Sequence, residues 1–134
     1  MKLKTIITFA LLSILFINCK SEEEKMIEKF LQYTKNTNIK ELKKISSKNT
    51  RKYLKLIYEP ILRLGDKDAK EKLQKMASSI KCTVEDKISK CSYADHQGNK
   101  HSFNISFVNG YDSQKNEDRL FIDIDKKYFF NSTN

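Results

Sequence analysis

The chain has 134 residues, a formal net charge of +9 at pH 7 and 39% hydrophobic residues, with only three glycines and one proline. This composition excludes a disordered tail and predicts a folded chain whose length suits one domain. The charge is uneven, because residues 25–81 hold 16 basic against six acidic residues, whereas residues 82–134 hold seven against eight. The first half is therefore expected to carry the basic surface.

The first stretch, residues 1–18, has the layout of an export signal. Lys2 and Lys4 form a positive start, and an apolar run from Ile6 to Ile17 follows it. As a helix this run would be about 20 Å long, short of the roughly 30 Å of a bilayer core. The residues Phe16–Cys19 resemble the lipobox of bacterial lipoproteins, with asparagine before the cysteine where Gly, Ala or Ser is commonest.

This resemblance implies that Cys19 is lipidated and becomes the first residue of the mature chain. Residues 19–24 would then be a lipidated tether, and the protein would sit in the bacterial cell envelope, expected at the outer membrane on its periplasmic or surface face. Two or more acyl chains give stable anchoring where one gives only marginal binding. The alternatives are ordinary secretory cleavage, which would leave an apolar run exposed, and a single-pass anchor, which would need more apolar residues.

Helical spacing and capping signals dominate residues 21–79. Ser21 lies three residues before Glu24, and Asn38 lies three residues before Glu41, the spacing of a capping box. We expect a helix from the first cap to about residue 35 and a short helix after the second. A third helix is expected from a cap at Asn49 or Thr50 to residue 64, with a kink or break near Pro60.

The end of this region supplies a stop signal and a further cap. Gly65 is expected to end the third helix as a C-cap glycine. Asp66 or Asp68 is expected to cap a fourth helix, in which Ala69, Leu73, Met76 and Ala77 face inward.

From residue 80 the pattern alternates and is rich in β-branched and aromatic residues, which predicts strands. We expect strands over 80–85, 88–93, 102–108 and 119–125. A turn at Asp86-Lys87, a turn over 95–100 and a longer loop from Asn109-Gly110 to Asp118 would join them as an antiparallel meander.

The predicted fold class is α+β, with the N-terminal helices packed on one face of a curved four-stranded antiparallel sheet. One domain would cover residues 25–130, and residues 131–134 would be a tail. A chain of this length can spare few apolar side chains for an empty pocket, so we expect the space between helices and sheet to be filled. The expected core residues are Phe30, Leu31, Leu54, Ile57, Phe103, Ile105, Phe107 and Ile122.

Three segments carry a resemblance to a known family: EKFLQYTKNTNIKELKKISSKNT at 28–50, SIKCTVEDKISKCSYADHQGNKHSFNISF at 79–107 and RLFIDIDKK at 119–127. Their order resembles the small bacterial lipoprotein domains of the nuclear-transport-factor-like, cystatin-like superfamily, over residues 22–127. The resemblance implies the helix-on-sheet fold just described. It implies no catalytic residue, because fold transfers between proteins better than function does.

Cys82 and Cys91 form an even pair in a chain expected to be exported, which favours a disulfide bond. If Asp86 and Lys87 occupy the turn, the register places the two cysteines directly opposite each other, although a bulge would change the pairing. The alternative is two reduced, buried cysteines. Two thiols alone are too few for a metal site.

His96 and His101, with Asp95 beside the first, could serve acid–base chemistry or bind a metal. No third ligand or nucleophile lies at a recognised spacing, so surface turn residues are the simpler interpretation. Asp123 and Asp125 lie two apart and would share one strand face. The sequence contains no phosphate loop, nucleotide fingerprint or triad motif, so we expect a protein that is not an enzyme and has no cofactor or metal.

Lysines on the predicted helices form a candidate surface for an anionic ligand, namely Lys43, Lys44, Lys52, Lys55, Lys70 and Lys75. A solvated helix face is the simpler interpretation of such charges. We expect a membrane-anchored, non-enzymatic binding or envelope-accessory module whose partner is a protein or a small apolar ligand, and not nucleic acid. The alternatives are an enzyme that uses a pocket in the cone-shaped fold and an adhesin that binds anionic glycans through the basic helices.

Overall fold

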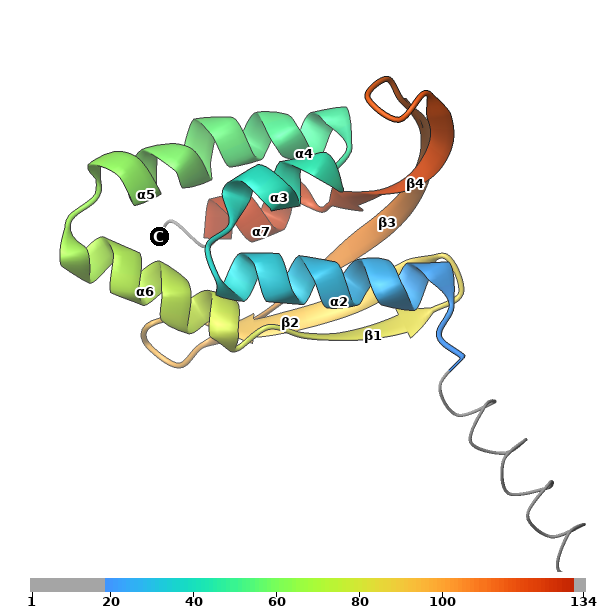
Figure 1. Ribbon diagram of the computed structural model, residues 1–134. Helices are drawn as coiled ribbons and strands as arrows, with labels where there is room; N and C mark the ends of the chain where they lie inside the picture. Colours follow the sequence, from blue (N-terminus) through green and yellow to red (C-terminus); the bar gives the residue numbers. More distant parts are fainter. Residues whose placement is uncertain (1–18, 132–134) are drawn as a thin grey trace, which may run out of the picture.

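The computed structural model describes residues 19–131, in which helices form a layer on one face of a curved antiparallel sheet (Figure 1). The predicted export signal, 1–18, and residues 132–134 lie outside the described residues. The elements are α2 (Glu22–Lys35), α3 (Ile39–Lys44), α4 (Lys48–Tyr53), the π-helix η1 (Leu54–Tyr58), α5 (Glu59–Leu64), α6 (Lys67–Ser78), β1 (Lys81–Glu85), β2 (Ile88–Ala94), β3 (Lys100–Asp112), β4 (Glu117–Ile124) and α7 (Lys126–Asn131). The predicted α+β class is confirmed. Within residues 19–131, none of the helices has the length and apolar character to span a bilayer.

The first two helices begin at the predicted caps. The Ser21 hydroxyl accepts a hydrogen bond from the Glu24 amide at 3.1 Å, and the Asn38 side chain accepts one from the Glu41 amide at 3.3 Å. Each bond satisfies an amide that the helix itself leaves without a partner. Three acidic residues in the first turn of α2 also lie at the positive end of the helix dipole.

The third helix differs from the prediction at its start and its middle. Its cap is Ser47, whose hydroxyl accepts from the Thr50 amide at 3.2 Å, and not Asn49 or Thr50. The helix does not break near Pro60. The wider π-helix η1 precedes the proline, and the Glu59 amide donates a hydrogen bond to the Leu54 carbonyl, five residues earlier. Pro60 then occupies the first turn of α5, so the wider turn accommodates a residue that has no amide to donate.

Gly65 ends α5 as predicted, but in an extended conformation with φ of −66° and not in the left-handed one. Glycine is required there by close approach, since a Cβ atom would lie 2.3 Å from the Ile61 carbonyl oxygen. Asp66 is the cap of α6 and accepts from the Ala69 amide at 2.8 Å. On α6, Leu73, Met76 and Ala77 are buried as predicted, and Ala69 is half-buried.

The sheet has the strand order β1-β2-β3-β4, all antiparallel, as a meander predicts. β1 and β2 pair in the predicted register, with Cys82 opposite Cys91 and no bulge, around a turn in which Asp86 takes a positive φ. The prediction of a long loop from Asn109 is wrong. β3 continues to Asp112 and β4 begins at Glu117, so only four residues form the turn.

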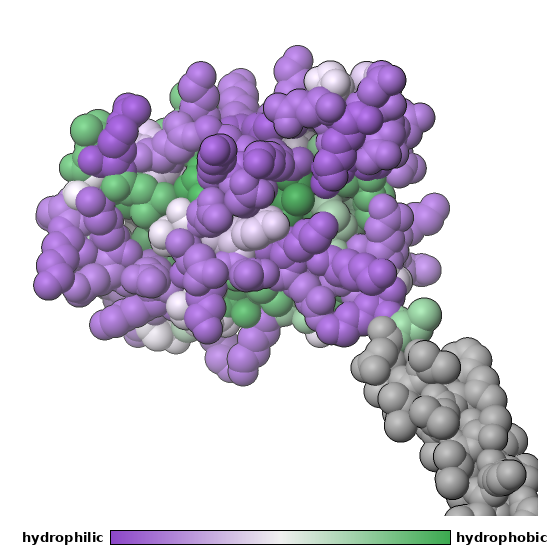
Figure 2. Space-filling model, viewed as in Figure 1, coloured by the Kyte–Doolittle hydropathy of each residue, from purple (hydrophilic) through white to green (hydrophobic). Residues whose placement is uncertain are grey.

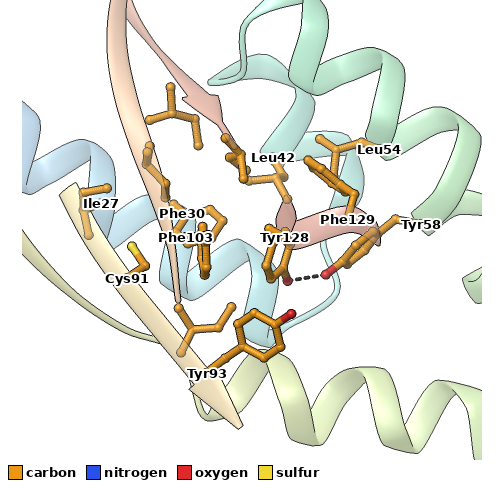
Figure 3. Packing of buried hydrophobic residues seen from close by; sticks show 14 of the residues in the cluster. Ile27, Phe30, Leu42, Leu54, Tyr58, Cys91, Tyr93, Phe103, Tyr128 and Phe129 are labelled. Atoms are coloured by element: carbon orange, nitrogen blue, oxygen red, sulfur yellow. Dashed lines mark hydrogen bonds between the residues drawn. The ribbon is translucent and has the colours of Figure 1, made fainter. Parts of the chain in front are cut away.

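The core contains most of the predicted residues and one element that was not predicted. Phe30, Leu54, Phe103, Ile105 and Ile122 are buried, whereas Leu31, Ile57 and Phe107 are half-buried at its margin. The helix α7 was missed, and it brings the fully buried Tyr128 and Phe129 into the centre of the core (Figure 3). It also includes Asn131, the first residue of the predicted tail.

A short segment seals the outer edge of β4. Ser46 pairs with Ile122 as an isolated parallel bridge, the Ile122 amide donates to the Ile45 carbonyl at 2.9 Å, and the Ser47 amide donates to the Ile122 carbonyl at 2.7 Å. One step further, the Ile124 amide donates to the buried Thr50 hydroxyl at 2.8 Å. These bonds satisfy edge groups that would otherwise lack partners, and they place α3 and α4 beside β4.

Candidate functional site

A cleft of about 510 Å³ lies where α2, α3 and α4 meet the end of the β3–β4 hairpin. We call it the basic cleft, because six cationic residues line it, namely Lys29, Lys43, Lys44, Arg51, Lys115 and Arg119. The only carboxylates of its lining are Glu41 and Asp112, which leaves a formal excess of four positive charges. Figure 2 shows that hydrophilic residues cover most of one face of the molecule. Apolar residues are visible between the part formed by α3, α4 and α5 and the part formed by α2 and α6. The cleft volume is in the range of small-molecule sites.

Three of these cations already have acidic partners. Lys44 Nζ lies 2.8 Å from Glu41 Oε1, and Lys43 pairs with Glu59, which lies outside the lining. The bond from Lys44 lowers the pKa of Glu41, so that this carboxyl stays charged. The third pair joins Arg119 to Asp112.

The other three cations, Lys29, Arg51 and Lys115, form no ion pair with any residue of the described 19–131. They come from α2, from α4 and from the β3–β4 turn, so three separate parts of the chain bring them to one cleft. Unpaired like charges around a hollow raise the local potential and attract anions. All three side chains are exposed, but they line one cleft and do not lie on a single helix face.

The hairpin end of the cleft is held in place by Asp112. One oxygen of this carboxylate accepts from the amides of Gln114 and Lys115, at 3.0 and 3.3 Å, and the other accepts from Arg119 at 2.9 Å. The bond from Arg119 is the main reason why the pKa of Asp112 is lowered. Arg119 lies over the Phe121 ring, 5.2 Å from its centroid, which adds a cation–π contact. The hairpin therefore presents its groups to the cleft from an ordered turn.

Three aromatic side chains, those of Tyr33, Tyr111 and Phe121, also line the cleft. Tyr33 is half-buried, and Tyr111 is 59% exposed, with its hydroxyl donating to Asn116 across the turn. Phe121 packs across Gly110, where a Cβ atom would lie 3.1 Å from the ring. Glycine at this position therefore leaves room for the ring.

Only two of the six lysines predicted to bind an anionic ligand line the basic cleft. Lys43 and Lys44 line the basic cleft, whereas Lys52, Lys55, Lys70 and Lys75 are not part of its lining. The prediction missed Lys29, Arg51, Lys115 and Arg119. Lys29 and Tyr33 lie four residues apart on one helix, which is a signal that could have found that wall. Nothing in the sequence pattern indicated Lys115 and Arg119, because a loop and not a hairpin was predicted at this place.

A second hollow, of about 530 Å³, adjoins the basic cleft and shares Tyr111 and Arg119 with it. Its other charged residues are Glu22 and Asp118, so its charge has the opposite sign. Neither carboxylate forms an ion pair with another of residues 19–131. Tyr111 and Arg119 thus stand at a boundary between a positive and a negative hollow.

Two of the three cysteines are paired, and the third is free. The sulfur atoms of Cys82 and Cys91 lie 2.07 Å apart, at the distance of a disulfide bond, which joins the edge strand β1 to β2. Cys19, the predicted lipidation site, is free and exposed, and only two residues separate it from the start of α2. Its lipidation stays a prediction.

The Asp95–His101 pair has a structural explanation. His101 Nε2 lies 2.8 Å from Asp95 Oδ2, whose second oxygen accepts from the Gln97 and Asn99 amides, both at 2.9 Å. The bond from His101 is the largest reason why the pKa of Asp95 falls to about 2. His96 is exposed, and neither hollow includes any of these residues. The pair closes the β2–β3 turn.

Two further predicted residues have local partners. Asp123 accepts from the Ser47 hydroxyl, and Asp125, which lies beyond the end of β4, accepts from the Lys127 amide at 3.0 Å where α7 begins. The two carboxylates therefore do not act as a pair on one strand. In the described part of the chain, no group of three or more His, Cys, Asp or Glu is placed to hold a metal ion.

Buried tyrosines form a separate polar group in the core. The hydroxyls of Tyr58 and Tyr128 are hydrogen-bonded, and the Tyr93 hydroxyl points toward this pair (Figure 3). Burial raises the pKa of Tyr128, and burial together with the charge of Asp95 raises the pKa of Tyr93. Both phenols are therefore neutral at ordinary pH, and neither is a ready general base.

Comparison with known proteins found no match among protein-family models, curated proteins or solved structures. The resemblance to the nuclear-transport-factor-like, cystatin-like superfamily stays a prediction.

Proposed function

We propose that the protein is a lipid-anchored, non-enzymatic binding module of the bacterial cell envelope, and that the basic cleft holds an anionic ligand. One observation carries the proposal: the cleft has four more cations than carboxylates, and three of the cations lack an acidic partner in residues 19–131. An anion would take the place of the missing partners. Charge-assisted hydrogen bonds of this kind are stronger than neutral ones.

The packing of the core supports an anion over an apolar ligand. Aromatic and aliphatic side chains fill the space between the helices and the sheet, and five of the core residues are completely inaccessible: Phe30, Leu54, Ile105, Ile122 and Phe129. Both described hollows lie at the surface and are rimmed by charges. An enzyme is the weaker alternative, because the Asp95–His101 pair lies outside both hollows.

Anion binding is tested by removing two unpaired cations of the cleft. Isothermal titration of the full chain in non-ionic detergent with a sulfated disaccharide would compare Lys29→Gln/Lys115→Gln with the control Lys70→Gln/Lys75→Gln, which loses the same charge outside the cleft. Exposed charge contacts are worth up to about 1 kcal/mol each, so the cleft variant should bind about tenfold more weakly while the control keeps its affinity. Equal losses in both variants would show that only the net charge matters.

The anchor is tested separately at Cys19, which is exposed and close to α2. Cys19→Ser should abolish incorporation of labelled palmitate and release the protein from the membrane fraction, because the thiol is the site of acylation. Unchanged labelling of the variant would contradict the lipoprotein assignment.

A further inference from the structure

We infer that the anion bound in the basic cleft is carried on a short acidic saccharide, an inference that rests on the proposed function and names the ligand class. The charges of the cleft select an anionic group, but other features of its wall select the body that carries the group. These features are an exposed aromatic ring, neutral polar side chains that make no hydrogen bond within residues 19–131, and a change from positive to negative charge toward the second hollow.

The exposed ring belongs to Tyr111, at the end of β3. Its hydroxyl is already bonded to Asn116, so the ring face is what remains available for contact. A ring held by such a bond offers a large, rigid surface at little entropic cost. The apolar face of a sugar ring can pack against it while the sulfate, phosphate or carboxylate of the sugar reaches the cations.

Neutral polar groups stand beside this ring. Ser113 and Gln114 line the cleft, and within residues 19–131 their side chains make no hydrogen bond. A hydroxyl both donates and accepts, and an amide supplies two donors and an acceptor. These groups match the hydroxyls of a saccharide, which a simple inorganic anion does not offer.

The charge beyond Tyr111 limits the length of the ligand. A chain that extends past this residue enters the second hollow and meets Glu22 and Asp118, whose charges are not neutralised by ion pairs in the described residues. These carboxylates would repel the anionic groups of a long ligand, and such repulsion selects against that ligand. A short acidic saccharide fits within the cleft, whereas a long polyanion would be repelled at this boundary.

The role of the ring is tested with two substitutions at Tyr111 and two probes, a sulfated disaccharide and inorganic sulfate, using the full chain in non-ionic detergent. Tyr111→Ala should weaken disaccharide binding at least fivefold and leave sulfate binding unchanged, whereas Tyr111→Phe, which keeps the ring and loses only the bond to Asn116, should weaken disaccharide binding less than Tyr111→Ala does. An inorganic sulfate that binds as tightly as the disaccharide, or a mononucleotide that binds more tightly, would overturn the inference. The proposed function would survive either result, because an anion would still bind the cleft.

The length limit is tested with a sulfated polysaccharide beside the disaccharide. Glu22→Gln/Asp118→Asn should raise affinity for the long chain at least threefold and leave disaccharide affinity unchanged. The control Glu23→Gln/Glu117→Gln removes the same charge from neighbouring positions outside the second hollow, and should change neither. Equal gains in both variants, or no gain, would refute the limit. Failure of every anion to bind would instead refute the proposed function.

Discussion

The most informative stability test is the removal of the Phe129 ring. This side chain has no exposed surface and lies among Tyr53, Tyr58 and Tyr128, with ring centroids 5.3, 5.6 and 5.3 Å away. Truncation of a buried phenylalanine to alanine costs about 3–5 kcal/mol, from lost transfer free energy and from the cavity left behind. Since domains are stable by only about 5–15 kcal/mol, Phe129→Ala should remove a large share of the free energy of unfolding.

The neighbouring residue supplies a matched control, because Phe130 is 52% exposed and touches Tyr53 only edge-on, at 6.0 Å between centroids. Phe130→Ala deletes the same atoms and should cost no more than about 1 kcal/mol. Urea unfolding followed by circular dichroism would measure both variants against the wild type. Equal, small losses would contradict the packing of α7 into the core.

Two further predictions concern the disulfide bond and the β2–β3 turn. Replacement of Cys82 and Cys91 by alanine should lower the free energy of unfolding by roughly 2–3 kcal/mol, since the bond closes a short loop, and alkylation of the wild type should count two more thiols after reduction than before. The pKa of Asp95 is about 2 in the folded chain, below its ordinary 3.8, so the stabilisation from its bond with His101 is complete above that ordinary value and is lost as the pH falls toward 2. The difference in urea midpoint between the wild type and Asp95→Asn should therefore narrow as the pH falls from about 4 to about 2, and a constant difference would contradict this role.

Elements that depend on neighbours in sequence could be predicted from sequence. Ser21, Asn38 and Asp66 each cap a helix through an amide three residues away, so the signal lies within one turn. The register of Cys82 and Cys91 likewise follows from a two-residue turn and the alternation of the strands. The fold class was predictable for the same reason, because the change from helical to alternating spacing is local.

Tertiary structure decided the elements whose own residues carry weak signals. α7 has only six residues, too few for a stable isolated helix, and it forms because Tyr128 and Phe129 are buried against the core. β3 continues through Asn109 to Asp112 because β4 supplies hydrogen-bonding partners to residues that otherwise favour a loop.

The basic cleft belongs to this second class. Lys29, Arg51 and Lys115 are distant in the sequence, and their separate contexts indicate nothing beyond a polar surface. They meet because Ser46 pairs with Ile122, which fixes α3 and α4 beside β4, and because Asp112 orders the turn opposite them. The sequence by itself determined that the first half of the chain is basic, and only the tertiary structure decided which of those charges converge, since convergence depends on long-range pairing that a local pattern does not contain.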